Sequence, residues 1–523
     1  MWAVTREPCD ETLIRSQPAT APCSKTRGRW VLAATILASS MAFIDSTVVN
    51  VALAALQADM NASAIDVQWV IEAYALLLSA FLLIGGSLGD LYGRRRIFLL
   101  GLVIFTMGSA ACGFSVTIKQ LIVARAFQGL GAAFLIPGSL AIISSSFDDK
   151  ERGRAIGTWS AFSAVTSAIG PVLGGWLIEH FSWRAVFFIN VPVAIVVSSI
   201  ALFHIPENVS SEKSRIDWLG AILVAAGLGA LVYGLLECAR IGFPSRSVVI
   251  SLVTAAFLLC FFVFVEMRAA APMLPLQLFR SKTFTGVNLV TFLLYGALGG
   301  TLFFLPFNLM QVQHYSATAA GAALLPFILI ISLLSRWSGG LLTRYGARPP
   351  LIIGPLIAAI GFGFFALPSR DGNYWTAFLP AIATLGLGMA ITVAPLTTAV
   401  MSAVEQKRAG TASGVNNAVA RTAALVAIAV LGIVMLRVFS SSLDQHLLQF
   451  KVAPSIAAAV KAQQAKLAAI SIPEDSDSET LVRRAIDESF IAGFRTVMII
   501  GAAMAAAGAL TSIVLITPQR RRN

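Results

Sequence analysis

The stretch GGSLGDLYGRRR, residues 85–96, has a second, shorter copy in this chain of 523 residues. The copy, GGLLTRYGARP, occupies residues 339–349, and both contain a glycine pair, a Tyr-Gly dipeptide and a following arginine. Each copy comes directly after an apolar segment and precedes another one. Such a recurrence at corresponding places in two halves of an apolar chain indicates a parallel internal repeat. The sequence therefore predicts two related bundles, each of six helices.

The composition is that of a chain surrounded by lipid. It is 57% hydrophobic and 12% charged, whereas soluble domains contain about 25% charged residues. A helix needs about 20 apolar residues to cross a bilayer, and about fourteen segments between residues 30 and 516 are long enough. The net charge of +12 comes from short basic clusters between these segments, which argues against a nucleic-acid partner. The predicted fold class is an all-α integral membrane protein with fourteen transmembrane helices.

The repeat also predicts the domain organisation, because two six-helix bundles leave two helices between them. Residues 1–29 are expected to form an N-terminal tail, 30–206 the first bundle, and 207–282 the inserted helices 7 and 8 with linkers. The second bundle is expected at 283–516, including an external loop at 440–489, before a tail at 517–523. The middle of this loop, residues 453–470, is rich in alanine and is predicted to form a helix outside the membrane.

Lys and Arg are concentrated in alternate loops. Because such loops stay in the cytoplasm, both termini are expected there, in a multi-pass protein of the cell (inner) membrane. The residues before Trp30 are polar, so no cleaved signal peptide is expected. The five cysteines and four histidines lack the spacing of metal ligands, and neither a metal nor a cofactor is expected.

Two charged residues lie inside predicted membrane helices. Asp45 belongs to FIDSTVVN, residues 43–50, and Arg125 to LIVARAFQGLGAA, residues 121–133. A carboxylate in a membrane helix costs about 2.5–3.5 kcal/mol on insertion scales, so a function is expected for it. Arg125 stays protonated and needs a partner, for which Asp45 is the obvious choice, with Gln128 on nearly the same face as Arg125. A purely structural ion pair is the alternative, but apolar residues often replace such pairs at little cost.

A second group of candidates consists of polar and aromatic residues in other predicted helices. Glu72 either extends toward the membrane interface or faces a cavity. Arg421 follows GVNNAVA, residues 414–420, and gives the second bundle its own polar cluster. Packing is the alternative role for the aromatic residues. The candidate cavity residues are Asn50, Gln128, Phe304, Asn308, Asn416, Asn417 and Arg421.

The repeated loop also contains candidates for gating. Asp90 at the predicted helix end, together with Arg94, is expected to make a charged contact that forms and breaks between the bundles. Gly86 and Gly93 would allow the tight turn. A simple topology anchor is the alternative. The second copy has Thr343 in place of Asp90, so its contact is expected to be weaker or absent.

The fifth predicted helix contains SAIGPVLGGWL, residues 167–177. Pro171 removes a backbone donor and is expected to kink the helix. Gly170, Gly174 and Gly175 would let a neighbouring helix approach closely. Packing alone is the alternative, but a kinked helix lined with glycine also suits a bundle that rocks against its partner.

Together these motifs resemble the major facilitator superfamily, specifically its fourteen-helix drug:proton antiporter family. FIDSTVVNVAL is similar to the family's first-helix motif, although Ala54 stands where proline is usual, and GGSLGDLYGRRR is similar to the loop 2–3 motif. RAFQGLGAA resembles the fourth-helix motif, and IGPVLGG the fifth-helix motif associated with exporters. The resemblance covers residues 30 to 516. It implies proton-driven export of small amphipathic or cationic compounds, such as drugs or toxic metabolites, with Asp45 and Arg125 in the coupling machinery.

The expected partners are a small-molecule substrate, protons and the lipid bilayer, without nucleic acid; accessory efflux proteins are left open. A proton-coupled uptake symporter and a dedicated metabolite exporter of the same fold are the alternatives. The Gly-Pro motif disfavours uptake. A membrane enzyme is disfavoured because the sequence lacks a nucleotide-binding loop and a clustered His, Asp or Glu constellation.

Overall fold

The computed structural model describes residues 25–147, 149–207, 217–269, 272, 274–370, 372–404, 409–472 and 479–517, and it contains helices without strands in this part of the chain. The first group of helices precedes residue 205. Its members are α2 (Lys25–Asp59), α3 (Ala64–Tyr92), α4 (Arg94–Phe114), α5 (Ile118–Ser146), α6 (Asp149–His180), α7 (Ala185–Phe188) and α8 (Asn190–His204).

Two further helices, α9 (Trp218–Ile241) and α10 (Arg246–Arg268), lead to the second group. That group contains several short 3₁₀ or π-helical pieces, labelled η. Its members are η1 (Leu276–Arg280), α11 (Lys282–Phe307), η2 (Asn308–Val312), α12 (Ala317–Ala323), α13 (Leu325–Tyr345), α14 (Arg348–Phe364), η3 (Tyr374–Phe378), α15 (Leu379–Ser402), α16 (Ala409–Gln449), α17 (Pro454–Lys461), η5 (Gln464–Ala469) and α18 (Glu479–Leu515).

Twelve helical stretches of the described chain are long and apolar enough to cross a membrane. Helix α14 is a shorter apolar helix, and α6 contains 32 residues. The all-α membrane fold is therefore confirmed, and the number of spans is near the fourteen that the sequence predicts. The count of fourteen itself stays a prediction.

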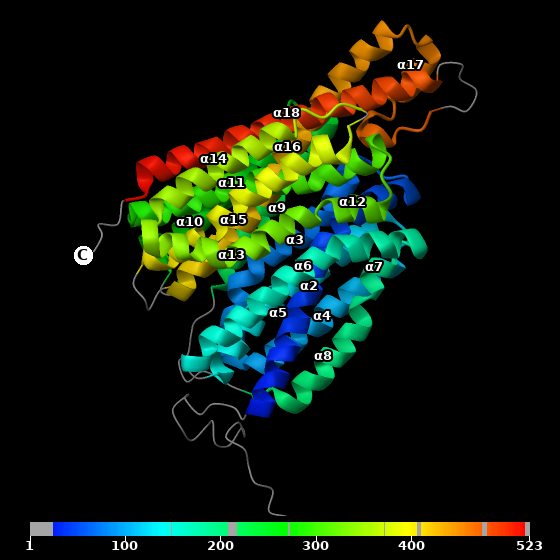
Figure 1. Ribbon diagram of the computed structural model, residues 1–523. Helices are drawn as coiled ribbons and strands as arrows, with labels where there is room; N and C mark the ends of the chain where they lie inside the picture. The colour runs from blue at the N-terminus through cyan, green and yellow to red at the C-terminus, as the bar shows by residue number, and fades with distance from the viewer. Residues whose placement is uncertain are drawn as a thin grey trace, which may run out of the picture.

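The helices pack in two groups, which lie on opposite sides of the molecule in Figure 1. In the first half, α2–α8, helix α5 packs against α3 and α4, and α2 packs against α6. In the second half, α11–α18, helix α11 packs against α16 and α18, and α14 against α15. Helices α9 and α10 pack on each other, while α9 contacts both α3 and α16. The inserted pair thus bridges the halves, and the exact domain boundaries stay predictions.

The start of α2 and the end of α18 lie away from the extension that contains α17 (Figure 1). We call the end with α17 the loop side and the opposite end the terminal side. Helices α16 and α18 contain 41 and 37 residues, more than the roughly 20 that a bilayer requires, and they extend into the loop side. The helix predicted at 453–470 is confirmed in part, as α17 and η5.

On the loop side, η5 of the second half contacts helix α2 of the first half. The Gln57 side chain donates a hydrogen bond to the Lys466 carbonyl at 3.1 Å, and Lys466 Nζ donates to Asn61 Oδ1 at 2.6 Å. Gln311, in η2, donates to Gln57 Oε1 at 3.0 Å. These contacts hold the two halves together at the loop side. We call the η5 segment that makes them the strap.

Helices α6 and α12 form a second contact between the halves on this side. The Glu179 carboxylate at the end of α6 accepts a hydrogen bond from the Thr318 hydroxyl. Hydrogen bonds from Ser316 and Thr318 hold the pKa of Glu179 below its usual range, so its carboxylate is charged at neutral pH. We call the boundary between the first half, α2–α8, and the second half, α11–α18, the seam. The seam is therefore closed on the loop side.

The glycines of α6 make this contact close. A Cβ atom at Gly175 would lie 2.6 Å from the Thr318 Cα atom, and one at Gly321 in α12 would collide with the Pro171 carbonyl. The other two candidate glycines of α6 face α2 within the first half, where Cβ atoms at Gly170 and Gly174 would collide with Thr47 and Val48. The predicted close approach is thus present, and Gly175 is the one of the three that faces the other half. Pro171 lies inside the continuous helix α6.

We expect Gly175→Leu to prevent closure of the loop side, because a leucine side chain cannot fit against the α12 backbone. In a variant without native cysteines, a cysteine at Leu53, a buried position of α2, should then react continuously with a membrane-impermeant maleimide added from the loop side. Gly157→Leu is the matched control, since a Cβ atom at Gly157 of the same helix meets nothing within 4 Å. Equal labelling in both variants would contradict the role of the α6–α12 contact.

Candidate functional site

A buried ion pair joins helices α2 and α5 in the first half. The Nη1 atom of Arg125 lies 2.6 Å from the Asp45 Oδ2 atom, and each residue is 1% exposed. Gln128 donates from Nε2 to the other carboxylate oxygen, Asp45 Oδ1, at 2.7 Å. Both oxygens of Asp45 are therefore engaged by groups of α5. The predicted partnership of Asp45, Arg125 and Gln128 is present in the structure.

Arg125 is held by more than its carboxylate partner. Its Nε atom donates to the Val70 carbonyl in α3 at 3.1 Å, and its Nη1 atom also donates to Gln128 Oε1 at 2.7 Å. Its guanidinium lies 4.2 Å from the centre of the Tyr74 ring, also in α3. A buried cation requires such compensation, because the desolvation of both ions in a buried pair is costly. The charge is thus surrounded by α2, α3 and α5 together.

Glu72 is a second buried acid in the first half. It is 0% exposed, and neither carboxylate oxygen has a hydrogen-bond partner within the described residues. Since it is buried, the alternative that it extends to the membrane interface is wrong. Its helix, α3, packs against α9 and α16, so this acid lies in the helix that contacts both the inserted pair and the second half.

The predicted polar cluster of the second half is dispersed. Asn416 donates to Asn288 Oδ1 at 3.1 Å and to Thr291 Oγ1 at 2.7 Å, which joins α16 to α11. Asn417 is exposed and donates to the Ser413 carbonyl of its own helix at 3.2 Å. Only Asn416 therefore contributes to a contact between helices.

Arg421, the charged member of this predicted cluster, is also in α16, which packs against α3 of the first half. The hydroxyl of Tyr74, in α3, has no hydrogen-bond partner within the described residues. Tyr74 thus contacts the buried pair and belongs to a helix that packs against the helix of Arg421.

The other three cavity candidates differ in their surroundings. Asn50 is partly buried and donates to the Ser46 carbonyl of its own helix, α2, at 3.0 Å. Phe304 is 1% exposed and its ring packs edge-on against Phe303, with centroids 4.7 Å apart. Asn308 is 2% exposed, its Oδ1 atom has no partner in the described structure, and it begins the π-helical turn η2. Phe304 is therefore a packing residue in this conformation, whereas Asn308 keeps an unused acceptor.

The candidates for gating in the repeated loop lie at the terminal side. Gly93 ends α3 with a φ of +106°, a conformation that favours glycine, and Arg94 donates to the Ala141 carbonyl at 3.2 Å. A Cβ atom at Gly86 would make only ordinary contact with Pro137, at 3.8 Å. The Asp90 side chain lies outside the described part of the structure, as does that of Thr343, so the proposed contact between the bundles stays a prediction.

Sequence reasoning missed two residues that complete these sites. Tyr74 lies one helical turn after Val70 on α3, so the spacing places both residues on one face of the helix. The spacing does not show that this face packs against Arg125. Glu207, just after α8, is 5% exposed and lies 3.6 Å and 3.5 Å from the Nε atoms of Arg95 and Arg96. No signal in the sequence distinguishes Glu207 from other acids at helix ends.

We expect Arg125→Gln to lower the free energy of unfolding by about 3–5 kcal/mol, because it leaves Asp45 buried without its cation. Denaturant titration in detergent micelles measures this, and the double variant with Asp45→Asn should recover much of the loss. Arg184→Gln is the control, since it breaks the Arg184–Asp59 ion pair. This pair is also short, at 3.0 Å, but its side chains are 36% and 51% exposed. Its loss should lower the free energy of unfolding by about 1 kcal/mol or less. Equal losses would show that burial of the Asp45–Arg125 pair has no energetic consequence.

Comparisons with known proteins identify the family. The model of the Major Facilitator Superfamily matches residues 35–429. The multidrug resistance protein Stp of Mycobacterium tuberculosis is 35% identical over 417 residues, which cover 80% of this chain and 77% of that protein. The methylenomycin A resistance protein of Bacillus subtilis is 32% identical over 415 residues, covering 79% of this chain and 88% of that protein.

A solved structure has the same fold. It is the crystal structure of a bacterial homologue of the human lysosomal transporter Spinster, in an inward-facing, unoccupied conformation; the TM-score is 0.66 with 19% identity, covering 96% of this chain and 100% of that one. The helical architecture and the match of the family model along most of the chain agree. The chain therefore belongs to the Major Facilitator Superfamily and is a membrane transporter rather than an enzyme.

Proposed function

We propose that this transporter is a proton-coupled antiporter that exports small amphipathic or cationic compounds across the cell membrane by alternating access. The observation that carries the proposal is the buried Asp45–Arg125 pair, a titratable acid that is fully engaged inside the first half. The relatives described above are named for resistance to drugs or to an antibiotic, which favours export of toxic compounds. Multidrug efflux is therefore the function that the site and the family support best.

Asp45 is the group that we assign to proton exchange. In the charged state it accepts from Arg125 and Gln128, which hold α5 against α2. A proton on Asp45 removes one charge of the pair, so the Coulombic attraction to Arg125 is lost and the two helices become free to separate. A cationic substrate competes with the proton for the same carboxylate, directly or through this network. Each crossing then carries either the substrate or the proton.

The exchange at Asp45 reaches the second half through Tyr74. Its ring contacts the Arg125 guanidinium, and its helix, α3, packs against α16, which contains Arg421. When Asp45 is protonated, the positive charge of Arg125 is no longer compensated and repels Arg421 more strongly. This repulsion across the seam favours separation of the halves. Glu72, buried without a hydrogen-bond partner among the described residues, is the second acid that we assign to proton transfer.

The substrate path follows the seam between the halves. Asn50, Asn308, Asn417 and Arg421 supply polar groups to it, and Phe304 supplies an apolar wall once the halves separate. The terminal side, where Lys and Arg are concentrated, faces the cytoplasm, and the loop side faces outward. A potential of 100 mV supplies about 2.3 kcal/mol for each unit charge that moves across the membrane. Proton entry from the loop side therefore drives export.

The Asp45→Asn variant tests this function, because it keeps the shape of the side chain and removes its titration. A proton gradient is established across the membrane of everted vesicles, and the transport of a fluorescent lipophilic cation such as ethidium is followed. Proton-coupled transport should fall to background, while the variant still inserts and folds. Asp59→Asn, the same change at the partly exposed end of the same helix, should transport like the parent.

The direction of transport separates the proposal from its alternative. Proton-driven accumulation of ethidium inside everted vesicles corresponds to export. Movement of ethidium out of the vesicles together with protons would indicate an uptake system. If the Asp45→Asn variant coupled transport to protons as strongly as the parent does, the coupling acid would lie elsewhere. Glu72→Gln would then be tested next.

We also expect Asp90→Asn to impair transport without affecting insertion, since Asp90 is the one acid among the arginines of the repeated loop. The measurement is the initial rate of ethidium transport, normalised to the amount of protein in the vesicle. Glu151→Gln, at the start of α6 and also at the terminal side, is the control. A parental rate in Asp90→Asn would leave this loop as a topology anchor.

A further inference from the structure

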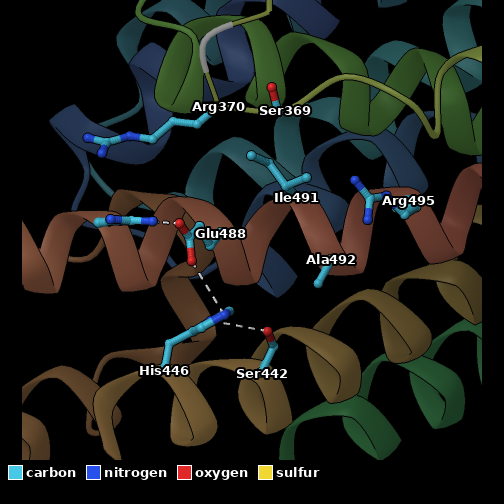
Figure 2. Close-up of a pocket in the computed structure, with 9 residues that line it drawn as sticks. Ser369, Arg370, Ser442, His446, Glu488, Ile491, Ala492 and Arg495 are labelled. Carbon is cyan, nitrogen blue, oxygen red and sulfur yellow. Dashed lines mark hydrogen bonds and ion pairs between the residues drawn. The ribbon is translucent and has the colours of Figure 1, made fainter. Parts of the chain in front are cut away.

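A basic pocket lies on the loop side of the second half, away from the seam. It has a volume of about 740 Å³ and is formed by the segment after α14, the outer part of α16 and the outer part of α18. Figure 2 shows Arg370 and Ser369 from the first of these, His446 and Ser442 from α16, and Glu488 and Arg495 from α18. Three chain segments that are distant in the sequence thus meet around one cavity.

The pocket contains more cations than acids. Arg370, Arg484 and Arg495 line it with His446, whereas Glu488 is the one carboxylate among its lining residues. Glu488 is shared, since it lies 2.7 Å from Arg484 and 3.5 Å from His446. The pocket therefore has an excess of positive charge.

The three arginines are anchored in a common way. The Nε atom of Arg370 lies 3.0 Å from buried Asp487, and the Nε atom of Arg484 binds Glu488. The Nε atom of Arg495 donates to the Ala366 carbonyl at 2.8 Å, and Arg495 has no carboxylate partner among the described residues. The terminal nitrogens of the three guanidinium groups have no hydrogen bond within this part of the chain. Each guanidinium group is therefore held through its Nε atom, and its terminal nitrogens remain as donors that match the oxygens of a phosphate group.

The position of the pocket along α18 indicates where such a phosphate comes from. Arg495 and Ile499 are exposed one turn apart, and Leu510 and Val514 continue the exposed face, with 62% and 77% of each residue accessible. Counting back from the end of α18 at Leu515, the roughly 20 residues that span the hydrocarbon reach Arg495. The apolar stripe thus faces lipid tails, and the arginines begin at headgroup level.

We propose that this pocket binds the phosphate-bearing headgroup of an anionic phospholipid in the loop-side leaflet. The acyl chains lie along the exposed stripe of α18, and the phosphate diester accepts hydrogen bonds from Arg484 and Arg495. The bound lipid joins α16 and α18 to the segment after α14 at the outer edge of the second half. The proposal is independent of the substrate and of proton coupling.

The test measures lipid binding by native mass spectrometry of the full-length protein purified in detergent. Added phosphatidylglycerol should bind more tightly than phosphatidylcholine of the same chain length. Arg495→Gln should weaken the phosphatidylglycerol interaction about tenfold, the loss expected for one charge-assisted hydrogen bond. Because Arg495 has no carboxylate partner in the described part of the chain, this change removes the cation of no described acid, and it keeps the Arg370–Asp487 and Arg484–Glu488 pairs of the pocket.

Arg246→Gln is the matched control, since Arg246 is an exposed arginine at the loop-side start of α10 and outside the pocket. It should bind phosphatidylglycerol like the parent. Equal binding of the two lipids, or equal effects of the two substitutions, would overturn the proposal. Competition by inorganic phosphate at concentrations equal to those of the lipid would instead assign the pocket to a free anion, which also overturns the lipid site. Unchanged melting temperatures without added lipid verify that both variants are folded.

Discussion

The ion pair between Asp45 and Arg125 is the constraint on which the first half depends. A guanidinium in a membrane helix must find its partners within the protein, and here they come from α2, α3 and α5. Three helices therefore have to meet at one point. Small residues make this possible, because a Cβ atom at Gly129 would collide with the Tyr74 carbonyl, and one at Gly108 would lie 2.7 Å from the Gln128 backbone nitrogen. The glycines of α4 and α5 are a consequence of burying the charge.

The two halves differ in their chemistry although they share a fold. The first half contains a charged pair and an additional acid, Glu72, while amides and hydroxyls such as Asn416 and Thr291 join helices in the second. The second half also has a buried acid, Asp487, but it lies at the loop side, where it pairs with Arg370. In the cycle that we propose, the second half responds through Arg421, whose helix α16 packs against α3, the helix of Tyr74. The titrating group that we propose therefore lies in the first half, and the responding group in the second.

Much of this architecture was predictable from the sequence. The repeat and the apolar segments predicted an all-helical membrane protein, and the two opposite charges in apolar segments predicted the pairing of Asp45 with Arg125. The spacing of Gln128 from Arg125 placed both on one helix face. The sequence could not predict which side of α3 faces α5, since that depends on packing, and so the role of Tyr74 was missed. For the same reason the polar residues near Arg421 were expected in one cluster, whereas they contact different helices.

The strap has a thermodynamic consequence for the resting state of the transporter. Its hydrogen bonds from Lys466 to Asn61 and from Gln57 to the Lys466 carbonyl join the two halves in the closed form, and separation of the halves at this side would break them. A contact present in one of two conformations shifts the equilibrium between them by its own free energy, whatever ligand is bound. The unliganded population is therefore biased toward the closed loop side by a segment that touches neither proton nor substrate site. A ligand that opens this side must bind the open form more tightly than the closed form by at least that amount, so the strap sets the smallest difference in affinity that can drive a cycle.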